Sequence, residues 1–70
     1  MRKNATLPKQ LGKRIQRKRK EIGLTQEELA DKIKVSRQYM GFIEQGRNTP
    51  SVEVLQKIAK NLKLPLSDLF

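Results

Sequence analysis

Two short helix signals separated by a tight turn constrain the fold of this chain more than any other feature. Thr25 is followed three residues later by Glu28, a spacing typical of the capping box that begins a helix. Lys34 and Val35 leave room for only a tight turn before Ser36, a residue that favours the start of the next helix. The sequence therefore predicts two consecutive helices packed at a steep angle.

The residues around this turn predict which side chains are buried. Ala30 is small enough to lie where the two helices cross, and Met40 and Ile43 are expected to point inward. The second helix then has an outward face, expected to consist of Arg37, Gln38, Gly41 and Phe42. Two helices joined in this way, with the second exposing a full face, are the outline of a helix-turn-helix.

The rest of the chain predicts three further helices and no strand. One runs from Pro8, in its first turn, to about Glu21, with an apolar face of Leu11, Ile15 and Ile22. Another runs from about Ser51 to Leu62, with an apolar face of Val52, Leu55, Ile58, Ala59 and Leu62. Residues 66–70 predict a final turn or two. We expect an all-α, five-helix domain over residues 9–70, preceded by a flexible basic arm over residues 1–8.

Positive charge is concentrated at one end of the chain. Residues 1–20 contain nine Lys or Arg residues and no acidic residue, whereas residues 21–70 contain seven of each sign, so the net charge of +9 belongs to the first segment. Such a block suits a polyanion, because neutralising phosphates releases condensed counterions. Arg17 and Lys18 are therefore assigned to phosphate contacts. A solubilising basic tail is the alternative for this segment.

The composition also disfavours several classes of protein. The sequence has no Cys and no His, which removes the usual metal ligands and the usual general base near neutral pH. Without a partner of that kind, the carboxylates of Glu27, Glu28 and Asp31 indicate a solvated helix face. No apolar run approaches the roughly 18 residues that span a bilayer. We expect a cytoplasmic protein that is not an enzyme and that has no cofactor, metal or evident small-molecule ligand.

The segment from Leu24 to Gly46 resembles the Xre-type family of phage Cro and repressor DNA-binding domains. The resemblance extends over about residues 11–70. It includes the lead-in Arg19-Lys-Glu-Ile-Gly23, the exit Ile43-Glu44-Gln-Gly46, the start of the fourth helix at Pro50-Ser51 and the close at Leu69-Phe70. It implies a five-helix bundle whose third helix enters the major groove of double-stranded DNA.

The resemblance also implies residue roles. Base reading is assigned to Arg37 on guanine, Gln38 on adenine and Phe42 on a thymine methyl group. Phosphate contacts are assigned to Gln26, at the start of the second helix, and to the loop residues Arg47, Asn48 and Thr49. Arg19 and Glu44 match a partly buried ion pair that joins the first helix to the third.

Two departures and two open positions accompany these roles. Lys34 occupies a turn position usually held by Gly, where a left-handed conformation costs about 1–2 kcal/mol. Gly41 lies inside a helix, where it would allow close approach to a base or sugar. Phe42 could contact a base, line the edge of the core or contact a protein. Tyr39 is expected to be half-buried with its hydroxyl near a phosphate, and Ser36 is also placed among the phosphate contacts.

The function expected from this pattern is transcriptional regulation, most simply as a repressor that binds a two-fold symmetric operator as a homodimer. The dimer surface is predicted at Leu66, Leu69 and Phe70. One alternative is an antitoxin-like or co-activator module whose main partner is a protein that contacts Phe42 and Phe70. Another is a cationic membrane-surface peptide formed by residues 9–22, which the capped helix-turn-helix disfavours.

Overall fold

Four α-helices and one short 3₁₀ helix make up the described part of the chain. The computed structural model describes the backbone of residues 3–70 and the side chains of residues 8–70. The elements are α1 (Lys3–Glu21), α2 (Gln26–Ile33), α3 (Arg37–Glu44), α4 (Val52–Asn61) and the 3₁₀ helix η1 (Leu66–Leu69), with no strand among the described residues. The predicted all-α fold is confirmed. The count of five helices is slightly wrong, because the last element is a four-residue 3₁₀ turn that has no side-chain cap.

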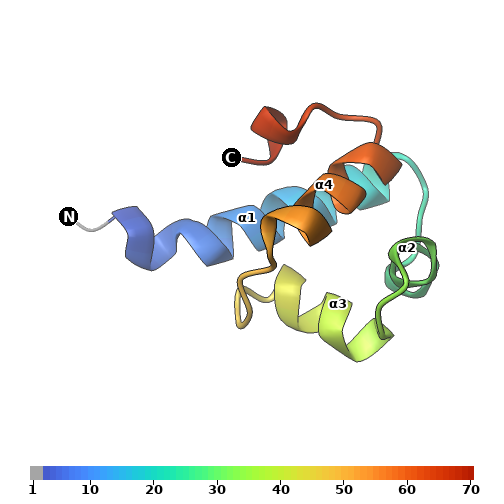
Figure 1. Ribbon diagram of the computed structural model, residues 1–70, viewed down its shortest axis with the longest axis horizontal. Helices are drawn as coiled ribbons and strands as arrows, with labels where there is room; N and C mark the ends of the chain where they lie inside the picture. The colour runs from blue at the N-terminus through green and yellow to red at the C-terminus, as the bar shows by residue number, and fades with distance from the viewer. Residues whose placement is uncertain (1–2) are drawn as a thin grey trace.

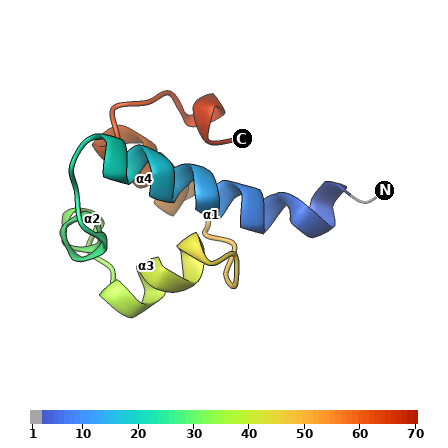
Figure 2. The ribbon, with the colours of Figure 1, turned by 180° about the vertical axis from the view of Figure 1, so that it is seen from behind.

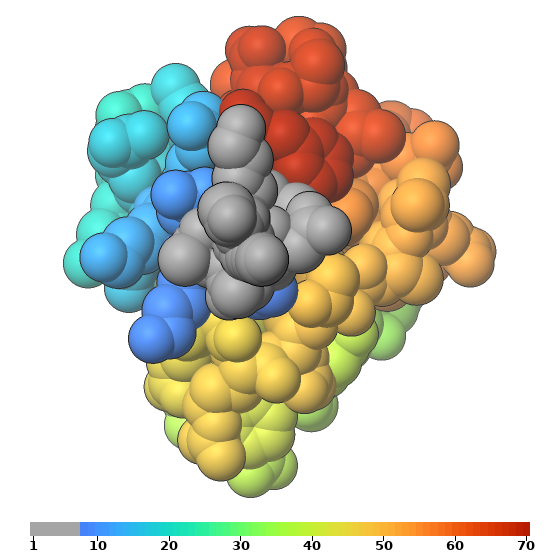
Figure 3. All heavy atoms as spheres, turned by 90° about the vertical axis from the view of Figure 1, so that its left-hand side faces the viewer, coloured from blue at the N-terminus to red at the C-terminus, as the bar shows by residue number. Residues whose placement is uncertain are grey.

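The longest helix separates two parts of the molecule. α3 lies along one side of α1 and η1 lies along the other, as Figures 1 and 2 both show. α2 packs against α3 and α4, and α4 also contacts η1. In Figure 3 the C-terminal residues and the loop after α3 lie at opposite ends of one face. α1 therefore presents one face to α3 and a different face to the C-terminal turn.

The helix starts follow the predicted caps. The amide of Glu28 donates to Thr25 Oγ1 at 3.0 Å, and the amide of Thr25 donates to Glu28 Oε1 at 2.8 Å, which completes the capping box. The bond from the Thr25 amide to the ionised carboxylate, followed by a contribution from the Thr25 side chain, holds the pKa of Glu28 below its ordinary value. Ser36 and Ser51 each accept a hydrogen bond from the amide three residues on. The predicted caps of α2 and α3 are confirmed, and Ser51 caps the start predicted for α4.

Among the residues whose side chains are described, twelve buried apolar ones form one core between the helices. They are Leu11, Ile15, Leu29, Ala30, Ile33, Met40, Ile43, Leu55, Ile58, Ala59, Leu62 and Leu69. Two residues that we predicted to be on apolar helix faces lie outside this core. Ile22 is 43% exposed because it follows the last residue of α1, and Val52 is 63% exposed at the first position of α4. The predicted apolar faces thus extended too far at the end of α1 and at the start of α4.

The first helix begins earlier than the sequence indicates. Pro8 lies inside α1 rather than in its first turn, because residues 3–7 already have helical backbone. Proline lacks an amide N–H, so α1 continues through it with one donor fewer. The predicted flexible arm covers residues 1–8, of which residues 1–2 lie outside the described part. Whether residues 1–8 act as an arm stays a prediction.

The turn between α2 and α3 has the predicted left-handed residue. Lys34 has φ 65° and ψ 42°, and its amide donates to the carbonyl oxygens at the end of α2. Val35 follows, and its amide donates to the Ala30 carbonyl oxygen at 3.0 Å. A non-glycine residue is therefore accepted in a conformation that L side chains disfavour.

Replacing Lys34 with glycine is expected to stabilise the fold by about 1 kcal/mol, because glycine adopts positive φ without a Cβ penalty. The measurement is the free energy of unfolding from a urea melt. Lys32→Gly is the matched control, since Lys32 is an exposed residue inside α2. There the same change should cost about 1 kcal/mol. Equal losses from both variants would contradict the strain assigned to Lys34.

Candidate nucleic-acid interface

The first turn of α3 presents two long polar side chains to solvent. Ser36 precedes the helix with extended backbone, and its hydroxyl accepts a hydrogen bond from the Tyr39 amide. Arg37 and Gln38 follow immediately, and both are exposed. The cap fixes the start of the helix and thus the direction in which these two side chains leave it. Their predicted outward position is confirmed.

Gly41 differs from that prediction, because it is buried. A Cβ at Gly41 would lie 3.7 Å from Gln26 Oε1, so the amide of Gln26 covers this point of α3. The expectation that Gly41 points outward is wrong. Helical periodicity places Gly41 on the outward side but does not show that a side chain of α2 reaches across it.

Phe42 and Arg47 form a stacked pair at the other end of α3. Phe42 is half-buried, and the guanidinium carbon of Arg47 lies 4.6 Å from the centre of its ring. The loop after α3 folds back onto the helix end, because the amides of Arg47 and Asn48 both donate to the Phe42 carbonyl oxygen, at 2.9 and 3.4 Å. Thr49 completes the exposed loop. The loop residues assigned to phosphate are therefore attached directly to α3.

A buried ion pair joins α1 to α3, as predicted. Arg19 Nε donates to Glu44 Oε2 at 2.7 Å, and Arg19 Nη2 donates to Glu44 Oε1 at 3.0 Å. The third contact of the guanidinium is the Leu24 carbonyl oxygen, at 2.8 Å from Nη1. Both charged residues are only 6% exposed. The bidentate geometry pairs the two charges where little solvent reaches them.

Gln26 extends this network to α2. Its Nε2 donates to Glu44 Oε1 at 3.1 Å, so the carboxylate of Glu44 holds side chains from two other elements. The network thus ties the beginning of α2 to the end of α3 and the end of α1. Gln26 remains partly exposed at the surface that it shares with Gly41.

Two residues of α1 near α3 were not singled out by the sequence. A Cβ on Gly12 would lie 2.5 Å from the Ile43 carbonyl oxygen and would also overlap the Glu44 carbonyl. A Cβ on Gly46 would lie 2.8 Å from both Cα and Cγ of Lys9, so exposed Lys9 lies beside the loop after α3. No local pattern marks either contact, because both are between segments far apart in the sequence.

Arg17 and Lys18 lie on the other side of α1. Gly12 and Arg19, seven residues apart, face α3, whereas Arg17 and Lys18 lie roughly 100–160° around the helix from them. Both line a groove with residues of the C-terminal turn, and Lys18 Nζ lies 3.7 Å from Glu21 Oε1. Their assignment to phosphate contacts stays a prediction, and it would require DNA to reach a side of α1 other than the one that packs on α3. Counting charges along the chain does not show which helix face carries them.

The predicted dimer surface also needs one correction. Leu69 is fully buried in the core, so it has no surface to offer a second chain. Leu66 is half-buried against the core, and Phe70 is 50% exposed. Of the three predicted interface residues, only Leu66 and Phe70 expose apolar surface.

Two other kinds of site are absent from the described part of the chain. Among those residues no group of acidic side chains is arranged to hold a metal ion. None of the helices described combines the length and the apolar character needed to span a bilayer.

Comparison with known proteins decides the family. The family model described as helix-turn-helix matches residues 15–69, which include all of α2, α3 and α4. The chain belongs to the helix-turn-helix family. It is 42% identical over 57 residues to an "uncharacterized HTH-type transcriptional regulator" of Archaeoglobus fulgidus, and the match covers 81% of each chain. It is also 42% identical to the immunity repressor protein of Bacillus phage phi105, over 81% of this chain and 40% of that one.

Solved structures agree with this assignment. The restriction-modification controller protein C.AhdI from Aeromonas hydrophila superposes with a TM-score of 0.86 at 33% identity, over 94% of this chain and 98% of that one. The helix-turn-helix protein described here is thus a transcriptional regulator with a DNA-binding domain, in a family of regulators that are not enzymes.

Proposed function

We propose that this helix-turn-helix protein is a repressor that binds a two-fold symmetric operator as a homodimer. The observation that carries the proposal is the exposed pair Arg37 and Gln38 in the first turn of the Ser36-capped helix α3. In a helix-turn-helix, the N-terminal residues of the second helix meet the base edges in the major groove. The similarity to a phage immunity repressor supports repression as the outcome of binding.

Base recognition follows from the chemistry of three side chains. The guanidinium of Arg37 can donate two hydrogen bonds to guanine O6 and N7, and the amide of Gln38 can pair with adenine N6 and N7. Phe42 offers the uncovered part of its ring to a thymine methyl group, with Arg47 stacked on the ring. Gly41 is left out of the base-reading set because Gln26 covers it.

Backbone contacts surround the reading residues. The loop Arg47, Asn48 and Thr49 is exposed and tied to α3, so it supplies phosphate contacts on one flank. Lys9 lies against Gly46 next to that loop and adds a cation. We place three further phosphate contacts on this surface: Ser36 and Tyr39 at the start of α3, and Gln26, which lies beside Gly41 and Glu44.

A homodimer accounts for a symmetric operator, because dimers of this motif bind half-sites about one helical turn apart. The apolar surface of Leu66 and Phe70 is the proposed contact between copies. A regulator of this kind works where the DNA is, so the proposal includes a cytoplasmic location.

The experiment that tests base reading compares Gln38→Ala with Asn48→Ala on two duplexes at one salt concentration. One duplex is the operator selected from random DNA, and the other has the same bases scrambled. Loss of a bidentate base contact costs about 1–3 kcal/mol on the correct sequence alone, so Gln38→Ala should weaken binding to the operator and hardly change binding to the scrambled duplex. Asn48→Ala, at a phosphate position, should weaken both equally.

Gln56→Ala is the matched control, since Gln56 is an exposed glutamine on α4. It should bind both duplexes as the unmodified protein does. If Gln38→Ala weakened both duplexes by the same factor, α3 would not be the element that reads sequence.

A further inference from the structure

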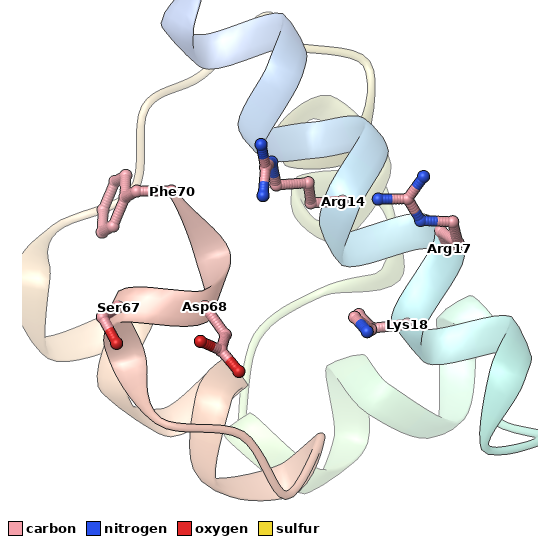
Figure 4. A pocket seen from close by; sticks show the side chains of 6 residues that line it. All are labelled: Arg14, Arg17, Lys18, Ser67, Asp68 and Phe70. Carbon is pink, nitrogen blue, oxygen red and sulfur yellow. The ribbon is translucent and has the colours of Figure 1, made fainter.

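A groove lies between α1 and the C-terminal turn, on the side of α1 away from α3. Its volume is about 270 Å³, and six of the residues whose side chains are described line it: Arg14, Arg17, Lys18, Ser67, Asp68 and Phe70 (Figure 4). α1 supplies the cations, and the C-terminal segment supplies a hydroxyl, a carboxylate and an aromatic ring. The groove thus combines positive charge, hydrogen-bond acceptors and an aromatic surface.

The cations in this groove are available to a ligand. Lys18 is 3.7 Å from Glu21, but that carboxylate and the lysine are both partly exposed. Arg14 and Arg17 are exposed and form no ion pair among the residues whose side chains are described. Arginine holds carboxylates through paired N–H donors, so two unpaired guanidinium groups form a strong site for acidic groups.

The DNA proposed for α3 does not account for this charge. Figures 1 and 2 place η1 and α3 on opposite sides of α1, so a duplex that contacts α3 lies away from the groove. A basic groove that faces away from the reading helix needs a different partner.

We propose that this groove docks an acidic peptide segment of a partner protein, in which an apolar side chain lies beside the carboxylates. The carboxylates would pair with Arg14 and Arg17, and the apolar side chain would pack on the exposed half of Phe70. On the wall opposite the cations, Asp68 and Ser67 can accept hydrogen bonds from N–H groups of the peptide. The volume suits one or two side chains of such a segment.

Charge complementarity favours a peptide over other occupants. A phosphodiester backbone has no N–H groups for Asp68 to bind, whereas a peptide backbone supplies them. If the groove of a second copy faced this one, it would add three cations and only one carboxylate, so the two grooves would repel each other. The peptide uses every wall of the groove, including Phe70, so it competes with the proposed contact between copies and not with DNA on α3.

The test measures binding of a labelled peptide, in which Asp and Glu residues flank one Leu, by fluorescence anisotropy. The variant Arg14→Glu/Arg17→Glu should weaken binding by at least about tenfold. The matched control is Lys57→Glu/Lys60→Glu, which makes the same change of net charge at exposed positions of α4. The control should retain most of the affinity, and both variants should keep the helical circular dichroism of the unmodified protein.

Two further arms separate the possible occupants. Phe70→Ala should weaken binding of the Leu peptide but not of a peptide with Ser in its place. A single-stranded oligonucleotide of equal charge should bind less tightly than the peptide. Equal losses in the two charge variants, or tighter binding of the oligonucleotide than of the peptide, would overturn the proposal. It would also be overturned if Arg14→Glu/Arg17→Glu abolished the dimer while the peptide did not compete with dimer formation.

Discussion

Replacing Arg19 with alanine is expected to destabilise the fold by about 3–5 kcal/mol, because the change leaves a buried carboxylate without its cation. Glu44 would retain only the hydrogen bond from Gln26, at 3.1 Å, while its side chain is 2% exposed. The Leu24 carbonyl oxygen would also lose its donor. A domain of this size has only a few kcal/mol to lose, so thermal or urea unfolding should show a large shift.

Lys18→Ala is the control for this prediction, since Lys18 is a neighbouring cation with an acidic partner. Its pair with Glu21 is 3.7 Å long and joins side chains that are 35% and 55% exposed. Surface pairs of this kind contribute about 0–1 kcal/mol. Similar losses from Arg19→Ala and Lys18→Ala would show that burial does not strengthen the Arg19 contact.

A double replacement separates a lost attraction from an orphaned charge. Arg19→Met combined with Glu44→Leu removes both charges and fills the space with apolar groups, which in other proteins is close to neutral. The double variant should therefore be more stable than Arg19→Ala alone. If it were less stable, the attraction between the two groups would outweigh the cost of burying them.

The sequence predicts elements well where local hydrogen bonds decide them. Thr25 with Glu28, Ser36 and Ser51 each mark a helix start that the structure confirms, because a cap involves atoms only two or three residues apart. The left-handed Lys34 was predicted from the family resemblance, because it occupies a turn position usually held by Gly. The Arg19–Glu44 pair spans 25 residues and could be predicted only through the family resemblance.

The sequence predicts surfaces poorly where distant segments decide them. The cover that Gln26 gives to Gly41 requires the packing of α2 against α3, which no spacing encodes. Leu69 was assigned to an interface because a short chain was expected to leave some apolar side chains exposed. In the structure Leu69 is buried in the core. The run that contains Arg17 looks like one basic block, but helical twist divides it between two sides of α1.

Gly12 is the second position where a single change should have a large effect. Gly12→Ala adds a Cβ that would lie 2.5 Å from the Ile43 carbonyl oxygen and would overlap the Glu44 carbonyl. These are backbone atoms near the end of α3, so no side chain can rotate away to make room. Forcing an extra methyl group into a packed site costs about 1–3 kcal/mol or more. This cost exceeds the gain of up to about 1 kcal/mol from the better helix propensity of alanine.

Gly41→Ala is the matched control, because both glycines are buried within helices and only one is in close contact with backbone. A Cβ at Gly41 meets the end of the Gln26 side chain at 3.7 Å, an ordinary contact. The variant should therefore gain about 0.5–1 kcal/mol from helix propensity alone. Urea melts of the two variants should differ in sign, with Gly12→Ala less stable and Gly41→Ala more stable than the unmodified protein. If both were stabilised, α1 would not approach the carbonyl groups of α3 closely enough for glycine to be required. Because the same approach brings Arg19 to Glu44, that outcome would also question how α1 supports the reading helix.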